Sequence, residues 1–137
     1  MNHPADEQIR VMFVEDDPEF VEMYRVSLEL QGYAVEVAND GRAGLQAIRE
    51  RAPDLVVLDM RMPGMTGLDV LRELRAEPAT ADLPVVVLTN YDEPGMVQEA
   101  YRLGALQWMV KVDTTPRTLA ERMGGWLRIE QGESTAP

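Results

Sequence analysis

The strongest constraint on this chain is a fivefold alternation of short apolar segments with stretches of helical spacing. The apolar segments span residues 11–14, 33–37, 55–58, 85–88 and 106–111. Those at 55–58 and 85–88 are apolar at every position, as is typical of parallel strands that helices cover on both faces. Because crossovers between parallel strands are right-handed, the alternation predicts an open α/β sheet of five strands in a single domain.

Local boundary signals precede each expected helix, in the form of a capping side chain or a first-turn proline. They are Asp17 with Pro18, Asp40 with Gly41, Thr66, Asp92 with Pro94, and Thr115 with Pro116. Helical spacing predicts that the second helix buries Ala43, Ala47 and Ile48, and that Leu68, Leu71 and Leu74 face inward on the third. The pair Gly124 and Gly125 should cost the last helix about 2 kcal/mol relative to alanines, so we expect this helix to bend or fray most readily.

Polar side chains stand where four of the expected strands end. Glu15, Asp16 and Asp17 follow the first strand, and Asp59 follows the third. Thr89 ends the fourth strand, and the fifth ends in Lys111, the only lysine of the chain. In open parallel sheets the functional crevice lies beyond the carboxyl ends of the strands, so these groups should meet there. Carboxylates suit a hard cation, while a hydroxyl and an ammonium suit phosphoryl oxygens.

Composition excludes several other functions. The net charge of −11 argues against nucleic-acid binding, which requires a basic face. No cysteine is present, and the one histidine, His3, lies in a polar leader; thiolate chemistry, a Ser-His-Asp triad and a histidine zinc site are thereby excluded. No apolar run approaches the roughly 20 residues that span a bilayer, and residues 1–10 lack a signal region. We expect a cytoplasmic protein.

The four strand-end motifs together resemble the receiver domain of two-component response regulators, over about residues 9–130. The resemblance rests on Val14-Glu15-Asp16-Asp17, on Leu58-Asp59-Met60-Arg61-Met62-Pro63-Gly64-Met65-Thr66-Gly67, on Leu88-Thr89 and on Val110-Lys111. It implies a flavodoxin-like (βα)5 three-layer sandwich whose five-stranded parallel sheet has the order 2-1-3-4-5. Residues 1–8 and 131–137 are then flexible tails, and the receiver stands alone without an output domain.

By this resemblance Asp59 is the phosphoacceptor, and a divalent cation, Mg²⁺ or Mn²⁺, assists the transfer. The implied metal ligands are the side chains of Asp16 and Asp59, the backbone carbonyl of Arg61, and waters, one of them held by Glu15. A cation is required because the attacking carboxylate and the phosphoryl group repel each other. Each acidic residue could instead only cap a helix or lie in a loop.

The resemblance also assigns a catalytic pair and a switch. Lys111 would contact a phosphoryl oxygen, and would pair with Asp59 before phosphorylation. Thr89 would donate its hydroxyl to another phosphoryl oxygen as it moves toward the site. Trp108, three residues before Lys111, stands at the aromatic switch position of the family. An ordinary packing role is the alternative for Trp108, since large aromatic side chains at strand ends are usually partly buried.

The implied partners are a sensor histidine kinase or a phosphotransfer protein as donor, or a small donor such as acetyl phosphate, and an unidentified downstream protein. Neither nucleic acid nor a membrane is bound directly. The chemistry is limited to self-phosphorylation and slow autodephosphorylation, so the chain is a switch rather than an enzyme. Met96, Tyr101 and Trp108 would form an exposed patch on the face of the fourth helix, fifth strand and fifth helix, which could also support a weak homodimer.

The sequence departs from the family at three places. Val112 follows Lys111 where most members have a proline after a cis bond, and a cis bond before valine would cost about 3–4 kcal/mol. Asn90 replaces a very small residue, and Trp108 is larger than the usual Tyr or Phe. We also predict that Arg61 and Tyr91 hinder hydrolytic water and lengthen the lifetime of the phosphorylated state.

These departures keep a second function open, namely a constitutive receiver-like interaction module that is regulated by docking rather than by phosphate. A flavin-binding protein of similar topology is a third interpretation. It would need a phosphate-cradling loop after the first strand, whereas here that loop carries three acidic residues that repel phosphate.

Overall fold

The computed structural model describes residues 8–130, which form a parallel five-stranded sheet. The strands are β1 (Arg10–Val14), β2 (Ala34–Ala38), β3 (Leu55–Leu58), β4 (Val85–Thr89) and β5 (Gln107–Val110). Their order across the sheet is β2-β1-β3-β4-β5, which confirms the predicted topology. The reversal of strand order beside β1 places the ends of β1 and β3 next to each other, where a crevice is expected.

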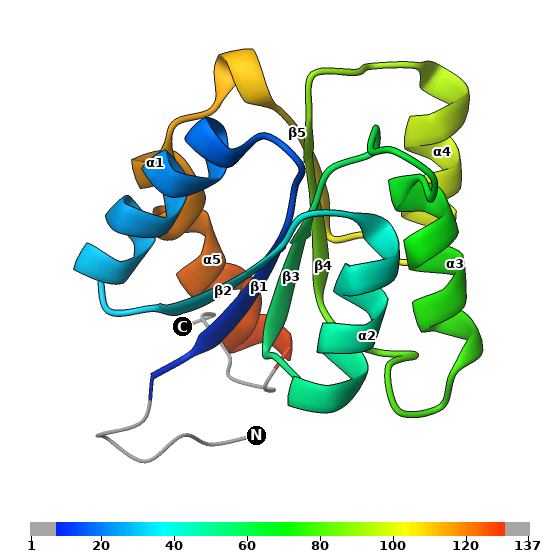
Figure 1. Cartoon of the computed structure of the whole chain (residues 1–137), viewed down its shortest axis with the longest axis horizontal. Helices are drawn as coiled ribbons and strands as arrows, with labels where there is room; N and C mark the ends of the chain where they lie inside the picture. Colours follow the sequence, from blue (N-terminus) through cyan, green and yellow to red (C-terminus); the bar gives the residue numbers. More distant parts are fainter. Residues whose placement is uncertain (1–7, 131–137) are drawn as a thin grey trace, which may run out of the picture.

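Helices cover both faces of this sheet (Figure 1). They are α1 (Pro18–Leu30), α2 (Gly41–Arg51), α3 (Gly67–Ala76), α4 (Pro94–Arg102) and α5 (Pro116–Glu130). Helices α1 and α5 lie on one face, and α2, α3 and α4 lie on the other (Figure 1). The predicted three-layer sandwich is therefore confirmed. Among the described residues, none of the helices has the length and apolar character needed to cross a membrane.

The two faces of the sheet have separate apolar cores. Alternate residues of one strand contribute to opposite cores: Met12 of β1 packs with Val56 of β3 under α2 and α3, whereas Phe13 packs with Val57 toward α1 and α5. All four residues of β3 are fully buried, as are the first three of β4. Burial on both sides explains why these strands are apolar throughout rather than alternating.

Four of the predicted helix caps are confirmed. One is Thr115, whose Oγ1 accepts a hydrogen bond from the Thr118 amide at 3.1 Å at the start of α5. The Asp17 carboxylate accepts hydrogen bonds from the backbone amides of the first turn of α1, and Asp40 does the same for α2. Thr66 and Asp69 form a reciprocal capping box at the start of α3. The prediction that Asp92 caps α4 was wrong. Pro94 is the first helical residue, so the cap position falls on Glu93, whose side chain makes no capping bond.

The buried face of α2 differs from the prediction. Ala43 is exposed and Ala47 only half-buried, although Ile48 is buried as expected. The helix instead turns Gly41 and Gly44 toward the sheet. A Cβ on Gly44 would lie 2.9 Å from a Val14 methyl carbon, so only glycine allows this close approach. Periodicity based on apolar side chains missed this face, because glycine has no side chain to count.

Several boundaries also shifted. Strand β2 begins one residue later than expected, and β5 ends at Val110, so that Lys111 opens a short 3-10 turn, Lys111–Asp113. The bond between Lys111 and Val112 is trans. Helix α5 is continuous through Gly124 and Gly125. Of the expected tails, residues 1–7 (with His3) and 131–137 lie outside the described residues, while the Gln8 side chain donates a hydrogen bond to the Gly32 carbonyl oxygen.

Candidate functional site

The register of the sheet brings the polar strand ends to one edge. Val14 of β1 pairs with Leu58 of β3, which in turn pairs with Val87 of β4. Thr89 at the end of β4 pairs with Val110 of β5. The residues that follow β1, β3 and β5 in the chain therefore emerge side by side with Thr89. The sequence supplied the polar side chains, and the parallel register puts them at one place.

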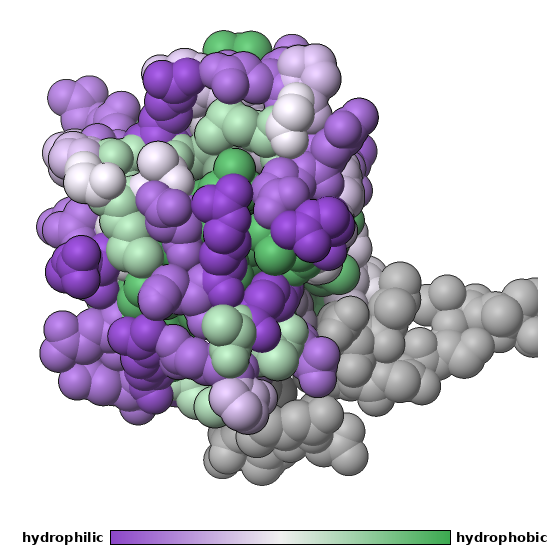
Figure 2. Space-filling model, turned by 90° about the vertical axis from the view of Figure 1, so that its right-hand side faces the viewer, coloured by the Kyte–Doolittle hydropathy of each residue, from purple (hydrophilic) through white to green (hydrophobic). Residues whose placement is uncertain are grey.

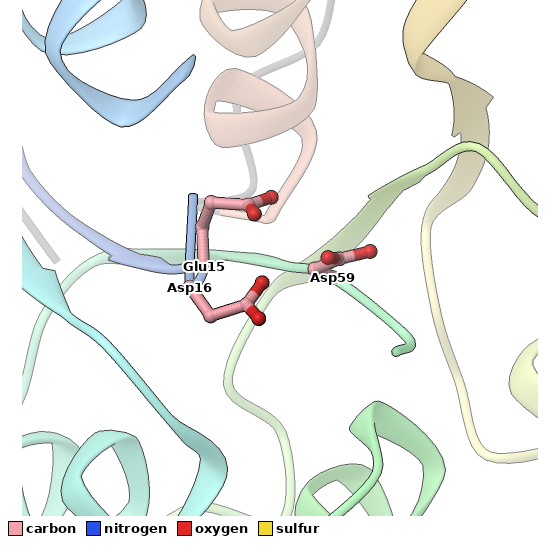
Figure 3. Close-up of side chains that lie close together, drawn as sticks. All are labelled: Glu15, Asp16 and Asp59. Atoms are coloured by element: carbon pink, nitrogen blue, oxygen red, sulfur yellow. The ribbon is translucent and has the colours of Figure 1, made fainter. Parts of the chain in front are cut away.

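Three carboxylates gather in the space beyond the ends of β1 and β3 (Figure 3). One oxygen from each of Glu15, Asp16 and Asp59 lies within 4.8 Å of the others. Glu15 is 1% and Asp59 5% exposed, whereas Asp16 is exposed to solvent. One oxygen of Asp59, Oδ1, accepts a hydrogen bond from the Met60 amide at 2.8 Å, which fixes the orientation of that carboxylate. The cluster thus has a buried floor and an open side.

Lys111 supplies the positive charge of the site. Its Nζ lies 2.6 Å from Glu15 Oε1 and donates a longer hydrogen bond, 3.4 Å, to Asp59 Oδ2. The predicted pairing with Asp59 is present, but Glu15 is the closer partner. Glu15 Oε1 has no hydrogen bond of good geometry among the described residues, so its contact with the ammonium is an ion pair rather than a directed bond.

The charges of the site are out of balance. Three carboxyl groups lie around one ammonium, so acidic groups outnumber basic ones in the site. Burial raises the pKa of Glu15 to about 7, although the ion pair with Lys111 partly opposes this rise. Burial lowers the pKa of Lys111, but Glu15 and Asp59 together outweigh it and raise that pKa overall.

The residues present fit a hard divalent cation. Their donors are carboxylate oxygens, the ligands that Mg²⁺ prefers, and a cation beside them would offset the excess negative charge. The site is therefore able to hold Mg²⁺ or Mn²⁺.

Two loops border the open side of the cluster. Thr89 is fully buried at the end of β4, and its Oγ1 accepts a long, 3.5 Å hydrogen bond from the Tyr91 amide. Asn90 points to solvent rather than into the protein. The Arg61 guanidinium lies 4.1 Å from the centre of the Tyr91 ring and donates a 2.8 Å hydrogen bond to Glu93. The β3–α3 and β4–α4 loops are thus joined by side chains beside the phosphoacceptor candidate.

Trp108 is buried, at 9% exposure, and faces the interior. Its Nε1 donates to the Tyr91 carbonyl oxygen at 3.0 Å, and its backbone amide donates to the Tyr101 hydroxyl at 3.0 Å. The predicted exposed patch was therefore wrong for Trp108, and Met96 is half-buried against the core. Only Tyr101 is exposed as expected. Figure 2 shows the face over α3 and α4 as mainly hydrophilic, with apolar side chains between polar ones.

One residue near the site was missed by the sequence pattern. Phe20 of α1 has the helical spacing of a core residue, and it does pack against the core. Its ring, however, also lies under the Lys111 ammonium, with 4.4 Å between Nζ and the ring centre. No local signal distinguishes such a ring from any other core aromatic side chain, because the contact joins α1 to the end of β5.

Comparison with known proteins defines the class to which this fold and site belong. The sequence matches the response regulator receiver domain over residues 11–123. The chain therefore belongs to the response regulator receiver family, the signalling domains of two-component systems. This result confirms the resemblance and does not favour the alternative of a module regulated by docking alone.

Individual relatives agree with this assignment. The chain is 37% identical over 124 residues to the DNA-binding response regulator MtrA of Mycolicibacterium smegmatis and 40% identical over 120 residues to the response regulator MprA of Mycolicibacterium vanbaalenii. These matches cover 90% and 88% of this chain but only 53% and 51% of the relatives. The chain thus spans about half the length of the curated relatives it matches.

Solved structures share the fold. The chemotaxis protein CheY4 of Vibrio cholerae superposes with a TM-score of 0.80 at 30% identity, covering 87% of this chain and 98% of that one. A CheY-like receiver domain protein from Methanospirillum hungatei superposes with a TM-score of 0.86 at 24% identity. The match covers 93% of this chain and 100% of the other. The second likeness supports the fold alone.

Proposed function

We propose that this receiver accepts a phosphoryl group on Asp59 in a reaction that depends on Mg²⁺, and that the modification changes which partner it binds. The observation that carries the proposal is the position of Asp59. It is a buried carboxylate just after β3, held by the Met60 amide, and it lies beside the carboxylates of Glu15 and Asp16 and the Lys111 ammonium. A carboxylate that is neither surrounded by arginine side chains nor exposed to solvent is suited to act as a nucleophile toward phosphorus.

In the proposed reaction an Asp59 oxygen forms a bond to phosphorus as the bond from phosphorus to the donor breaks. The donor is a phosphohistidine of a sensor kinase or phosphotransfer protein, or a small acyl phosphate, and its imidazole nitrogen or carboxylate oxygen leaves with the bonding electrons. The Lys111 ammonium then turns from Glu15 toward a phosphoryl oxygen, and the Thr89 hydroxyl donates to another. Both groups act by positioning and charge stabilisation, as is general for phosphoryl transfer.

The metal ligands proposed are Asp16, Asp59, the backbone carbonyl of Arg61, and a water held by Glu15. When bound, Mg²⁺ or Mn²⁺ lowers the repulsion between the attacking carboxylate and the anionic phosphoryl group. The exposed side of Asp16 suits a metal that keeps several waters. Within this scheme the chain acts on itself alone, by self-phosphorylation and slow autodephosphorylation.

The proposed switch couples Thr89 to Trp108 through the intervening loop. The Thr89 hydroxyl and the Trp108 indole both contact Tyr91, one through its amide and the other through its carbonyl group. Movement of Thr89 toward a phosphoryl group would therefore alter the environment of the indole. A change in tryptophan fluorescence with Mg²⁺ and beryllofluoride, a phosphoryl mimic, would report this coupling; an unchanged spectrum and unchanged partner affinity would favour the docking module.

The partner surfaces belong to the same proposal. Helix α1 starts beside the site and exposes Met23, Val26 and Leu30 at spacings of three and four residues, an apolar strip suited to a helical phosphodonor. The weak homodimer through α4, β5 and α5 stays a prediction, although burial of Trp108 removes one of the side chains expected to support it. We also propose that the reaction takes place in the cytoplasm, as for a receiver domain of two-component signalling.

Intact-mass spectrometry tests the central step. The protein is incubated with acetyl phosphate or phosphoramidate and Mg²⁺, beside Asp59→Asn and a chelated sample. One phosphoryl adduct that is lost in both controls supports the proposal. No adduct in the native protein, with Mg²⁺ binding confirmed separately, contradicts it and favours the docking module.

A further inference from the structure

The Lys111 ammonium has a third partner besides its two carboxylates. It is 12% exposed and lies 2.6 Å from Glu15 Oε1, 3.4 Å from Asp59 Oδ2 and 4.4 Å from the centre of the Phe20 ring. An ammonium over the face of an aromatic ring is attracted by the ring's negative face, and more strongly where water is excluded. The ring therefore forms an apolar wall that stabilises the charge instead of repelling it.

The Phe20 ring is itself fixed in place. It packs in a tilted arrangement against Tyr24 one turn later on α1, with ring centres 4.6 Å apart, and forms an edge-type contact with Phe13 of β1, with ring centres 6.4 Å apart. Tyr24 is fully buried, and its hydroxyl donates to the Thr114 carbonyl oxygen at 3.0 Å. A ring held by a buried neighbour and by the sheet cannot follow a mobile lysine, so it limits where the ammonium can rest.

The backbone after Lys111 does not determine where the lysine ammonium lies. Val112 is 80% exposed and so packs little against the protein. Two hydrogen bonds from Thr114 close the turn. Its hydroxyl donates to the Val110 carbonyl oxygen at 2.8 Å, and its amide donates to the Lys111 carbonyl oxygen at 3.2 Å. These bonds fix the backbone, but the four-carbon stem of lysine has many rotamers. The position of the ammonium must come from side-chain contacts.

We infer that Phe20 is a positioning residue for Lys111, holding its ammonium over the site so that it can pass from Glu15 to a phosphoryl oxygen on Asp59. The inference rests on the proposed phosphorylation of Asp59 and adds a residue that lies outside the charged cluster. Without the ring face, the ammonium keeps only the two carboxylates and gains freedom to turn toward solvent. The Phe20 side chain has no metal-ligating or hydrogen-bonding atom, so it acts through Lys111.

The test compares Phe20→Leu, which keeps an apolar side chain but removes the ring, with Phe20→Tyr, which keeps the ring face. We expect the rate of phosphorylation by phosphoramidate at saturating Mg²⁺ to fall about tenfold in Phe20→Leu. Phe20→Tyr should restore most of the native rate, and the Kd for Mg²⁺ should be unchanged in both. In a Lys111→Ala background, Phe20→Leu should cause no further loss, because the ring then has no ammonium to hold.

A second measurement does not depend on phosphorylation. Lys111 is the only lysine, so an amine-reactive reagent followed by peptide mass spectrometry reports on its ammonium alone. Labelling should be severalfold faster in Phe20→Leu than in Phe20→Tyr. Equal labelling of the two variants, or an equal loss of rate with and without Lys111, would overturn the inference. If the native protein takes no phosphoryl group, the proposed function fails, but the labelling comparison still decides the role of Phe20.

Discussion

Gly67, the first residue of α3, should be intolerant of any side chain because it packs directly on the backbone of Asp59 and Met60. A Cβ at this position would lie 2.3 Å from the Asp59 carbonyl oxygen, 2.5 Å from Met60 Cε and 2.9 Å from Met60 Cα. The flexible end of Met60 could move aside, but the other two atoms belong to the backbone. Gly67→Ala must therefore displace α3 or the segment that carries Asp59.

The expected size of the effect follows from two opposing terms. Overpacking typically costs about 1–3 kcal/mol, and contact with backbone atoms puts this site near the upper limit. Alanine is favoured over glycine in a helix by at most about 1 kcal/mol, which offsets only part of that cost. We expect Gly67→Ala to lower the free energy of unfolding by about 2 kcal/mol. A displaced Asp59 would also be phosphorylated more slowly.

Urea unfolding checks this value, with Gly95→Ala as the matched control. Gly95 lies in the first turn of α4, and a Cβ there would have no neighbour within 4 Å. The control should be neutral or slightly stabilising, by up to about 1 kcal/mol. If the two alanine variants have the same unfolding free energy, the close approach of α3 to Asp59 does not constrain this position, and our reasoning is refuted.

Three further predictions concern the lifetime of the phosphorylated state, the stability at alkaline pH, and the contacts of Arg75 near the end of α3. Replacing Arg61 and Tyr91 together with alanine should shorten the half-life of the phosphorylated state severalfold, as measured by intact mass, because their stacked side chains border the site. Burial raises the pKa of Tyr24 to about 12. The neutral phenol therefore contributes fully to the free energy of unfolding below about pH 10, and this contribution is lost as the pH rises toward 12. In urea unfolding, Tyr24→Phe should show a smaller loss of stability over this alkaline range. Arg75→Met should lower the unfolding free energy by about 2–4 kcal/mol, because the guanidinium donates to the carbonyl oxygens of Leu83 and Leu103, at 2.9 and 2.6 Å, among others.

Controls and contrary outcomes differ among these predictions. A half-life that stays within error after both loop substitutions would show that Arg61 and Tyr91 do not restrict water. An equal alkaline loss in Tyr24→Phe would assign that loss to other groups. Arg117→Met, at an exposed position on α5, is the control for Arg75→Met and should be close to neutral. Equal effects of the two arginine variants would contradict the role given to the Arg75 carbonyl contacts.

Local signals predicted most of the fold. The Asp17, Asp40, Thr66 and Thr115 caps are confirmed because capping depends on a few adjacent residues. The cap of α4 was misplaced by one residue, since Pro94 at the first helical position makes its predecessor the cap whatever its side chain. The buried face of α2 was misjudged because the space that a glycine leaves is visible only when the strand beneath it is known.

For the candidate site, the sequence indicated the residues but not all of their contacts. Asp16, Asp59, Thr89 and Lys111 could be chosen from the sequence because each stands where an apolar strand stops. Their roles as metal ligands, phosphoacceptor and catalytic pair remain predictions. Among the contacts that could not be anticipated are the ion pair of Lys111 with Glu15, which is closer than that with Asp59, and the indole bond of Trp108 to the Tyr91 carbonyl oxygen. Both join segments that are far apart along the chain.

The sequence by itself determined the succession of strands and helices, most of the helix caps, and the polar residues at four of the strand ends. These features depend on interactions between near neighbours and on the burial that an apolar run requires. Only the tertiary structure decided the distances within the site, the inward orientation of Trp108, and the position of the Lys111 ammonium over the Phe20 ring. Such contacts form between side chains brought together by the register of the sheet and the packing of α1, and no local pattern specifies them.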